Sequence, residues 1–588
     1  MQFKPIRSLA LLCAAALPFV PLARASGDTT MAMGGPVSAD KLSSAATDSD
    51  QWLTYGRDLS ATRHSPLAQI DTGTVGKLKV AWKKSLGPPI SMEGTPIVNN
   101  GVMYVTTGIS AIFALNAKTG ATIWQYHYPL PAVARGRVCC NINNRGVTLT
   151  GNKVIFGTLD AHLVALDAGT GKVLWNTTVA NNALAYSITS PPLPVKNMVL
   201  TGVGGGEYPT RGFIAAYSAD TGKFIWRRYT VPGPGEPGYN TWKNHLAAKT
   251  GGGPTWLPGT YDPARNTVYW GTGNPNPDWD TNSVPGDLLF TSALIAMDAD
   301  TGKIKWYYQF TPHDIWDYDG VNEPMLVDVP LAGGQGTTAA IAHADRNGYL
   351  YLINRDTGKL IYAVPFLNKV TWGKVDRTTG KITFDPKIQA LAKARKNYDV
   401  APAVIGGKNW EPTAYDPARH LFFIPALESS ITMTAEKASV EHPKPGVFNF
   451  GGFVANPKFA GSISAWDLTT GKMVWKKPFR SPAFGGALST GGGLVFVGQL
   501  EGELDALDAT TGKTLWHVKT KSGINAPPST YALDGQQYVA VESGIGGVWP
   551  LFFMPVTPWL KAVPPASLIY TYKLPAGVGS MSMAAPSH

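Results

Sequence analysis

Short stretches of alternating apolar and polar residues recur along the whole chain, and each runs into the same kind of turn. The phrase Ala-Leu-Asn-Ala-Lys-Thr-Gly-Ala-Thr-Ile-Trp ends at Trp124, and Ala-Leu-Asp-Ala-Gly-Thr-Gly-Lys-Val-Leu-Trp ends at Trp175. Further copies end at Trp226, Trp306, Tyr362, Trp475 and Trp516, and a degenerate copy ends at Trp82. The alternation has the period of two that is typical of half-buried β-strands. The pattern therefore predicts eight copies of one β-rich unit.

Each unit combines a strand, a tight turn and a return strand that carries an aromatic residue. In the Asp/Asn-x-x-Thr-Gly turn the Asx side chain can accept backbone N–H groups, and the glycine can adopt a positive φ. A second strand, such as 102–107 or 153–158, precedes most copies. Four short antiparallel strands and one recurring aromatic per unit are typical of a propeller blade. We therefore predict an all-β, eight-bladed β-propeller in which each Trp packs between neighbouring blades.

The spacing of the aromatic marks indicates where functional loops lie. The interval from Trp226 to Trp306 is 80 residues and that from Tyr362 to Trp475 is 113 residues, longer than the others. The longer interval contains an insertion over 363–452, with a predicted helix over 386–396. We assign 45–575 to the propeller, 26–44 to a flexible segment and 576–588 to a disordered tail, because both flanks are rich in small and polar residues.

The N-terminal residues resemble an export signal. Lys4 and Arg7 precede an apolar stretch, and Ala23-Arg24-Ala25 fits a small-x-small cleavage pattern, so we assign 1–25 to a signal peptide. A retained anchor is the alternative, but the stretch is too short to span a bilayer. We therefore expect a periplasmic protein with no stable membrane anchor. The formal net charge of +11 comes from scattered basic residues, which argues against nucleic-acid binding.

Two of the three cysteines, Cys139 and Cys140, are adjacent. Neighbouring Cα atoms lie about 3.8 Å apart, below the usual disulfide range of about 4.4–6.8 Å, so a bond between the two cysteines would close a strained ring. A pair of free thiols is the alternative. The chain has no Cys-x-x-Cys-His sequence and hence no attached c-type haem. Any electrons taken from a substrate must therefore leave through a separate carrier.

Three further departures from the repeat carry candidate metal ligands. Glu207 follows three glycines, Asn274 ends a strand just before a proline, and Asp317 and Asp319 alternate within 311–324. Alternate residues of an extended segment face the same way, and two neighbouring carboxylates repel each other unless a cation lies between them. Taken singly, these motifs also fit a glycine-rich turn, an Asx-Pro turn and an acidic surface turn.

In combination, the adjacent cysteines and the Trp-Asp-Tyr-Asp segment at 316–319 resemble the methanol and ethanol dehydrogenases that depend on pyrroloquinoline quinone (PQQ). The resemblance covers essentially the whole chain after residue 25. It implies that Cys139 and Cys140 form a ring disulfide on one face of PQQ, with Trp256 on the other face. It also implies roles for other residues: metal ligands Glu207, Asn274 and Asp317; catalytic base Asp317; further PQQ contacts Glu93, Arg145, Thr189, Arg346 and Trp549.

Asp319 bears on the identity of the metal. The resemblance implies a small residue two places after the catalytic aspartate in calcium enzymes and a second aspartate in lanthanide enzymes. An extra carboxylate suits a trivalent ion, which prefers more negative charge than calcium does. We therefore add Asp319 to the metal ligands and expect a lanthanide(III) ion, with calcium as the second choice.

The implied activity is oxidation of a small primary alcohol to an aldehyde by metal-assisted hydride transfer to PQQ, with a soluble cytochrome c as the electron acceptor. A homodimer is compatible with this interpretation. Where the resembled enzymes carry an Asn-containing stretch against the quinone, this chain reads Ile424-Pro-Ala-Leu-Glu-Ser-Ser-Ile-Thr-Met433, followed by an unusual insertion up to Gly452. This departure keeps two alternatives open: a PQQ dehydrogenase of a polyol, sugar or polymer alcohol, and a non-catalytic propeller scaffold.

Overall fold

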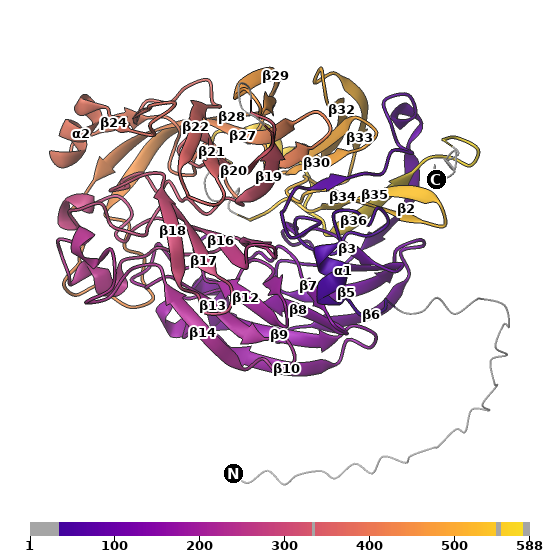
Figure 1. Cartoon of the computed structure of the whole chain (residues 1–588), viewed down its shortest axis with the longest axis horizontal. Helices are drawn as coiled ribbons and strands as arrows, with labels where there is room; N and C mark the ends of the chain where they lie inside the picture. The colour runs from indigo at the N-terminus through magenta and orange to yellow at the C-terminus, as the bar shows by residue number, and fades with distance from the viewer. Residues whose placement is uncertain (1–33, 332–335, 548–553, 580–588) are drawn as a thin grey trace, which may run out of the picture.

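The computed structural model describes residues 34–331, 336–547 and 554–579. The predicted signal peptide (1–25), Trp549 and most of the predicted tail lie outside these residues. Within the described part, eight sheets of four or five strands follow one another along the chain. A separate two-stranded hairpin lies between two of them in the sequence. Figure 1 shows the sheets arranged around a ring, which confirms the predicted eight-bladed propeller.

The first four blades consist of consecutive strands. They are β3 (Ile97–Asn99), β4 (Val102–Thr106), β5 (Ala111–Asn116) and β6 (Thr122–His127); β7 (Thr148–Thr150), β8 (Lys153–Gly157), β9 (His162–Asp167) and β10 (Val173–Thr178); β11 (Leu193–Val195), β12 (Met198–Gly202), β13 (Phe213–Ser218) and β14 (Phe224–Tyr229); and β15 (Thr260–Asp262), β16 (Thr267–Thr272), β17 (Ala293–Asp298) and β18 (Ile304–Gln309).

The remaining blades include the insertion and the ring closure. They are β19 (Met325–Val329), β20 (Thr338–Ala344), β21 (Tyr349–Asn354) and β22 (Leu360–Pro365); β25 (Tyr398–Val400), β26 (Ala414–Asp416), β27 (Leu421–Ala435), β28 (Gly452–Asp467) and β29 (Lys472–Phe479); β1 (His64–Ser65), β30 (Ala487–Thr490), β31 (Leu494–Gly498), β32 (Glu503–Asp508) and β33 (Thr514–Lys519); and β34 (Ser529–Leu533), β35 (Gln536–Ser543), β36 (Leu568–Lys573) and β2 (Lys79–Ser85).

The ring closes by pairing the two ends of the chain. Strand β2 lies antiparallel to β36, so an N-terminal strand completes the C-terminal blade, beside β34 and β35 in Figure 1. The pairing of β2 with β36 ties the first part of the chain to the last blade through one ladder of backbone hydrogen bonds, and a propeller of this kind keeps only short strand edges.

Five of the recurring tryptophans dock one blade onto the next through a hydrogen bond, as predicted. The indole Nε1 of Trp124 donates to the Ala168 carbonyl at 2.9 Å, and those of Trp82, Trp175, Trp226 and Trp475 make the equivalent bond one blade further on. The glycine of the next turn lies under the ring: a Cβ on Gly171 would meet Trp124 at 2.6 Å. The same glycine has a φ of 71°. The turn glycine therefore serves both the turn and the contact between blades.

Two predicted features, one in the N-terminal flank and one in the insertion, differ from the structure. Residues 34–44 were expected to be flexible, but they contain α1 (Ala39–Ser43), whose Leu42 is buried, and Val37 pairs with Gly151. Burial of apolar side chains such as Val37 and Leu42 explains the packing. The predicted helix over 386–396 exists as α2 (Pro386–Lys393) and ends earlier, because Arg395 adopts a positive φ of 52°.

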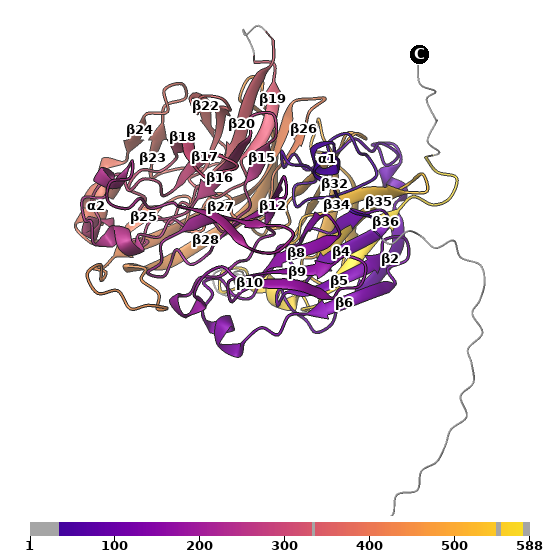
Figure 2. The same ribbon diagram turned by 60° about the horizontal axis from the view of Figure 1, so that its bottom comes forward.

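The insertion adds structure at one side of the ring. Hairpin β23 (Gly373–Val375) and β24 (Ile382–Phe384) precedes α2, and β25 pairs with the far half of the long strand β27. Figure 2 shows β25 and α2 beside β27 and β28. The 3-10 helices are η1 (Val75–Lys77), η2 (Ala132–Gly136), η3 (Asn182–Leu184), η4 (Tyr239–Thr241), η5 (Ala247–Thr250), η6 (Thr281–Ser283) and η7 (Pro558–Ala562). Among the described residues, no helix has the length and apolar content needed to cross a bilayer.

Candidate active site

Loops from successive blades enclose a cavity of about 280 Å³. The segments 138–145, 187–189, 204–207, 256, 279, 317–319, 346, 404–410 and 448–450 all contribute to its wall. Most of these segments connect strands, which is where a rigid scaffold presents binding groups. Nine predicted site residues line this one cavity: Cys139, Cys140, Arg145, Thr189, Glu207, Trp256, Asp317, Asp319 and Arg346.

The adjacent cysteines form a disulfide on the cavity wall. The two Sγ atoms and a carboxylate oxygen of Glu207 all lie within 4.8 Å of one another. The indole of Trp256 also lines the cavity, and its Nε1 donates to the Asp319 carboxylate at 2.8 Å. The cavity therefore has a sulfur surface and an indole among its walls, both suited to packing against a flat, polarisable ligand.

Arg145 places a buried positive charge at the edge of the cavity. Its Nη2 pairs with Glu93 at 2.9 Å and its Nη1 donates to Thr189 Oγ1 at 2.9 Å. The guanidinium also lies 5.2 Å from the Trp256 ring centroid and 5.4 Å from that of Trp410. Burial raises the pKa of Glu93, and Arg145 opposes that shift. Glu93 does not line the cavity itself and acts on it through Arg145.

Arg346 joins the two aspartates that were predicted to converge. Its Nη1 bonds to Asp319 Oδ2 at 2.5 Å, and its Nη2 lies 3.3 Å from Asp317 Oδ2. Asp319 also accepts the backbone N–H of Asn274 at 2.5 Å. Asp317 has a φ of 61°, a left-handed conformation that is uncommon outside glycine and often marks functional sites.

Asn274 and Asp278 present buried oxygens without partners. Asn274 Nδ2 donates to Asp278 Oδ1 at 2.7 Å, which leaves Asn274 Oδ1 and Asp278 Oδ2 with no hydrogen bond inside the described protein. A Cβ on Gly206, next to Glu207, would lie 2.6 Å from Asn274 Oδ1. The glycine therefore lets the Glu207 loop come close to the amide. A buried acceptor without a donor is costly unless a ligand satisfies it.

Carboxyl groups gather at this end of the cavity. Burial raises the pKa of Asp317, which Arg346 opposes and Asp319 and Glu207 reinforce. Burial likewise raises the pKa of Glu207 to about 7, with a smaller contribution from Asp319. The pKa of Asp278 is also raised, again chiefly by burial. Four carboxyl groups therefore interact with one another here, and one guanidinium pairs with only two of them, Asp317 and Asp319. A bound cation would stabilise such an arrangement.

Several residues of the cavity wall were not predicted from the sequence. These are Trp279, Asn409, Trp410, Phe448 and Phe450 on the cavity wall, together with Asp278 beside Asn274. Asp278 stands four residues after Asn274 in the same motif, so its spacing was a usable signal. By contrast, none of the residues in 424–433 lines the cavity, and Glu428 in that stretch pairs with Lys476.

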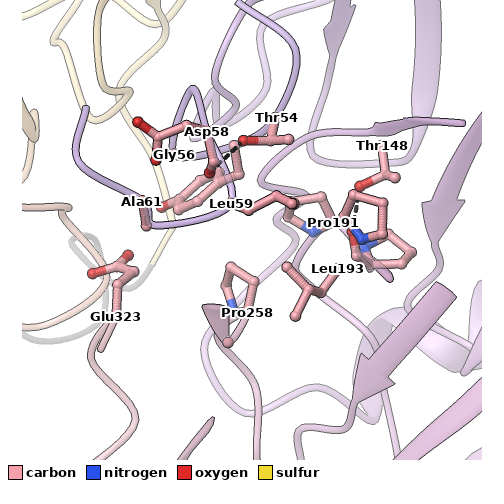
Figure 3. A pocket seen from close by; sticks show the side chains of 14 residues that line it. Thr54, Gly56, Asp58, Leu59, Ala61, Thr148, Pro191, Leu193, Pro258 and Glu323 are labelled. Atoms are coloured by element: carbon pink, nitrogen blue, oxygen red, sulfur yellow. Dashed lines mark hydrogen bonds between the residues drawn. The ribbon is translucent and has the colours of Figure 1, made fainter. Parts of the chain in front are cut away.

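A second cavity, drawn in Figure 3, is a poor candidate for the same role. Its volume is about 20 Å³, and the side chains of Leu59, Leu193 and Pro258 lie around it. Glu323 at its edge pairs with the buried Lys408 at 3.6 Å. A space of this size holds little more than a water molecule.

Comparisons with known proteins agree on one family. A family model described as glucose/ethanol/alcohol dehydrogenase, β-propeller domain, matches residues 52–371 and 461–539. The quinoprotein alcohol dehydrogenase PedH of Pseudomonas putida is 38% identical over 565 residues, covering 92% of this chain and 93% of the relative. A quinoprotein ethanol dehydrogenase of the same species is 35% identical, covering 96% of both chains.

Solved structures give the same result. The quinohemoprotein alcohol dehydrogenase of Comamonas testosteroni superimposes with a TM-score of 0.86 at 34% identity, covering 92% of this chain and 83% of that one. A europium-containing methanol dehydrogenase superimposes with a TM-score of 0.84 at 33% identity, covering 91% of this chain and 100% of that one.

Proposed function

The chain belongs to the PQQ-dependent alcohol dehydrogenases, and on that premise we propose that its cavity of about 280 Å³ holds PQQ and one metal ion at the residues described above. Members of this family oxidise alcohols with PQQ, so a non-catalytic scaffold is excluded. The observation that carries the proposal is the unpartnered Asn274 Oδ1, buried beside Asp278 and Asp319.

The residues present fit a planar, polyanionic cofactor. The Cys139–Cys140 disulfide and Trp256 provide flat surfaces, and Arg145 and Thr189 provide donors at the cavity edge. Arginine binds carboxylates well because its donors form a planar fork. We propose that these residues, with Arg346, hold the cofactor, and that Trp549, which lies outside the described residues, contributes a further contact.

The donor set also fits a metal ion. Glu207, Asn274, Asp317 and Asp319 offer three carboxylates and one neutral amide oxygen, the ligand type that hard cations prefer. We propose a lanthanide(III) ion as the resident metal, with calcium second. The second carboxylate, Asp319, and the likeness to a europium-containing methanol dehydrogenase support this choice.

Bound PQQ would supply the acceptor for the hydride of the alcohol's carbinol carbon, and a metal ion held by Glu207, Asn274, Asp317 and Asp319 would supply Lewis acidity. Asp317 accepts the proton of the substrate hydroxyl at its carboxylate. Burial of Asp317 raises its pKa and so favours the protonated carboxyl group that the transfer produces. Arg346, at 3.3 Å, opposes this shift and favours the carboxylate that starts the reaction. Arg346 therefore keeps the base available, and the surrounding rings exclude water.

We further propose that the protein works in the periplasm on small alcohols and passes electrons one at a time to a soluble cytochrome c. The absence of a haem-attachment sequence in the chain supports a separate carrier.

The proposal is tested with Asp317→Asn, which keeps the shape of the side chain and removes the base. The protein is produced with PQQ and either calcium or lanthanum, and dye-linked oxidation of ethanol is measured. We expect kcat to fall by at least about 100-fold, the usual worth of a general base, while the visible absorbance of bound PQQ is retained. Asp220→Asn, at an exposed position, is the control. Wild-type activity in Asp317→Asn would contradict the proposal.

A further inference from the structure

Four aromatic rings form a continuous stack along one side of the candidate active site. Tyr208 and Phe448 lie 4.6 Å apart, Phe448 and Phe450 lie 4.8 Å apart, and Phe450 and Trp279 lie 4.9 Å apart between ring centroids. The planes of neighbouring rings differ by 23°, 17° and 11°. Phe448, Phe450 and Trp279 line the cavity that contains Asp317. The stack is therefore part of the wall against which a substrate would lie.

The segment that carries the two phenylalanines, 436–451, is attached to the loops of the candidate metal ligands. The backbone N–H of Asn449 donates to the carbonyl of Glu207 at 2.9 Å, and its side-chain amide donates to Asn276 at 2.9 Å. Trp279 donates its backbone N–H to the carbonyl of Phe450 at 2.8 Å. These bonds fix the rings relative to Glu207 and Asn274, and so relative to the reacting centre.

The cavity leaves no charged group for the rest of the substrate. Its charged lining residues are Arg145, Glu207, Asp317, Asp319 and Arg346, all of which have roles toward cofactor, metal or base. The charged residues of the segment 436–451 are exposed and do not line the cavity. Extra hydroxyls of a polyol that lay against the faces of Phe448, Phe450 and Trp279 would lose their water without gaining hydrogen bonds from those rings, and such loss is unfavourable.

We propose that Phe448, Phe450 and Trp279 form the subsite for the carbon substituent of the alcohol, and that this subsite selects primary alcohols with an aromatic group over polyols and sugars. The inference rests on the proposed function, because it assigns the substrate class of the same site. Offset stacking of a substrate ring on Phe448 or Phe450 provides the selectivity.

Phe448→Ala tests the subsite with little risk to folding, because the side chain is 44% exposed. Phe453→Ala is the matched control, since Phe453 is 49% exposed and does not line the cavity. We expect Phe448→Ala to lower kcat/KM for benzyl alcohol by about three- to tenfold, as loss of one aromatic contact predicts, and kcat/KM for ethanol by less than about twofold. Phe448→Tyr should restore the selectivity, and wild-type enzyme should prefer benzyl alcohol to glycerol.

Binding without turnover separates this inference from the proposed function. The tertiary alcohol 2-phenyl-2-propanol has no hydrogen on its carbinol carbon and cannot be oxidised, so its affinity for the PQQ-loaded protein is measured by calorimetry, with tert-butanol for comparison. Tighter binding of the phenyl compound, lost in Phe448→Ala and kept in Phe453→Ala, supports the subsite even if no alcohol is oxidised. Equal affinity for both compounds would overturn the inference. So would a wild-type preference for glycerol over benzyl alcohol, or a fall in kcat/KM that is equal for benzyl alcohol and ethanol in Phe448→Ala.

Discussion

Replacing Asp319 with asparagine changes the charge of the proposed metal site and keeps its shape. In the protein, the Asp319 carboxylate accepts from the Asn274 N–H, from Trp256 Nε1 and from Arg346 Nη1. An asparagine can still accept from Asn274, but its amide nitrogen then faces the two other donors. Arg346 would be left with Asp317, at 3.3 Å, as its carboxylate partner.

The size of the effect follows from Coulomb's law. One pair of unit charges about 4 Å apart is worth about 4 kcal/mol at an effective dielectric constant of about 20. Removing one negative charge therefore costs a trivalent ion about 12 kcal/mol and a divalent ion about 8 kcal/mol before hydration is counted. The difference of about 4 kcal/mol corresponds to roughly a thousandfold, and a water ligand in place of the carboxylate recovers part of it. We expect Asp319→Asn to lose at least about tenfold more affinity for a lanthanide than for calcium.

Terbium luminescence gives a direct assay. The indole of Trp256 bonds to Asp319 and can sensitise a terbium ion bound there, so the PQQ-loaded protein is titrated with terbium and then with competing calcium. Asp220→Asn controls for the loss of one charge elsewhere, because Asp220 lies on the exposed turn before β14. The reasoning is refuted if Asp319→Asn binds terbium with the wild-type affinity and the wild-type preference over calcium.

Three further predictions concern other parts of the structure. Burial raises the pKa of Glu542 to about 8, above its ordinary value, so the folded protein holds a proton that the unfolded chain releases, and stability falls as the pH rises from about 4.5 to about 8. Glu542→Gln should reduce the loss of unfolding free energy by up to about 1.4 kcal/mol per pH unit, as urea unfolding at pH 5 and pH 8 would show. The same loss between the two pH values in the wild type and the variant would contradict this. Arg145→Met should weaken PQQ binding by about ten- to a hundredfold in an absorbance titration, because it removes charged hydrogen bonds, and an unchanged Kd would rule out its role. Gly302→Ala should destabilise the protein by about 2–4 kcal/mol, since the residue has a φ of 66° and a Cβ would meet Trp226 at 2.5 Å; an unaltered melting temperature would disprove this packing argument.

The fold could be predicted because its signals are local and repeated. The Asx and Gly residues of each turn predict its conformation locally. Each repeat also carries its own aromatic residue, as Trp124 does where it packs over Gly171. Eight copies of the same weak sequence motif along the chain are therefore enough to predict a propeller. The packing of residues 37–43 was missed because their partners, such as Gly151 for Val37, lie far along the chain.

The candidate site could be predicted where its residues are neighbours in sequence. Cys139 and Cys140, or Asp317 and Asp319, show their relation directly in the sequence, and the disulfide is present in the structure. Phe448 could not be placed, because its position depends on how a loop of the long β27–β28 hairpin returns to the Glu207 backbone. Such a return depends on contacts between distant segments, which no local pattern encodes.

The central claim, that one oxygen-lined metal site and one quinone share the cavity, is tested most directly by a crystal structure of the holoprotein loaded with PQQ and europium, with anomalous data at the europium edge. The account predicts one strong peak about 2.5 Å from oxygens of Glu207, Asn274, Asp317 and Asp319, with the quinone between the disulfide and Trp256. A europium peak elsewhere, or a quinone bound outside this cavity, would contradict it.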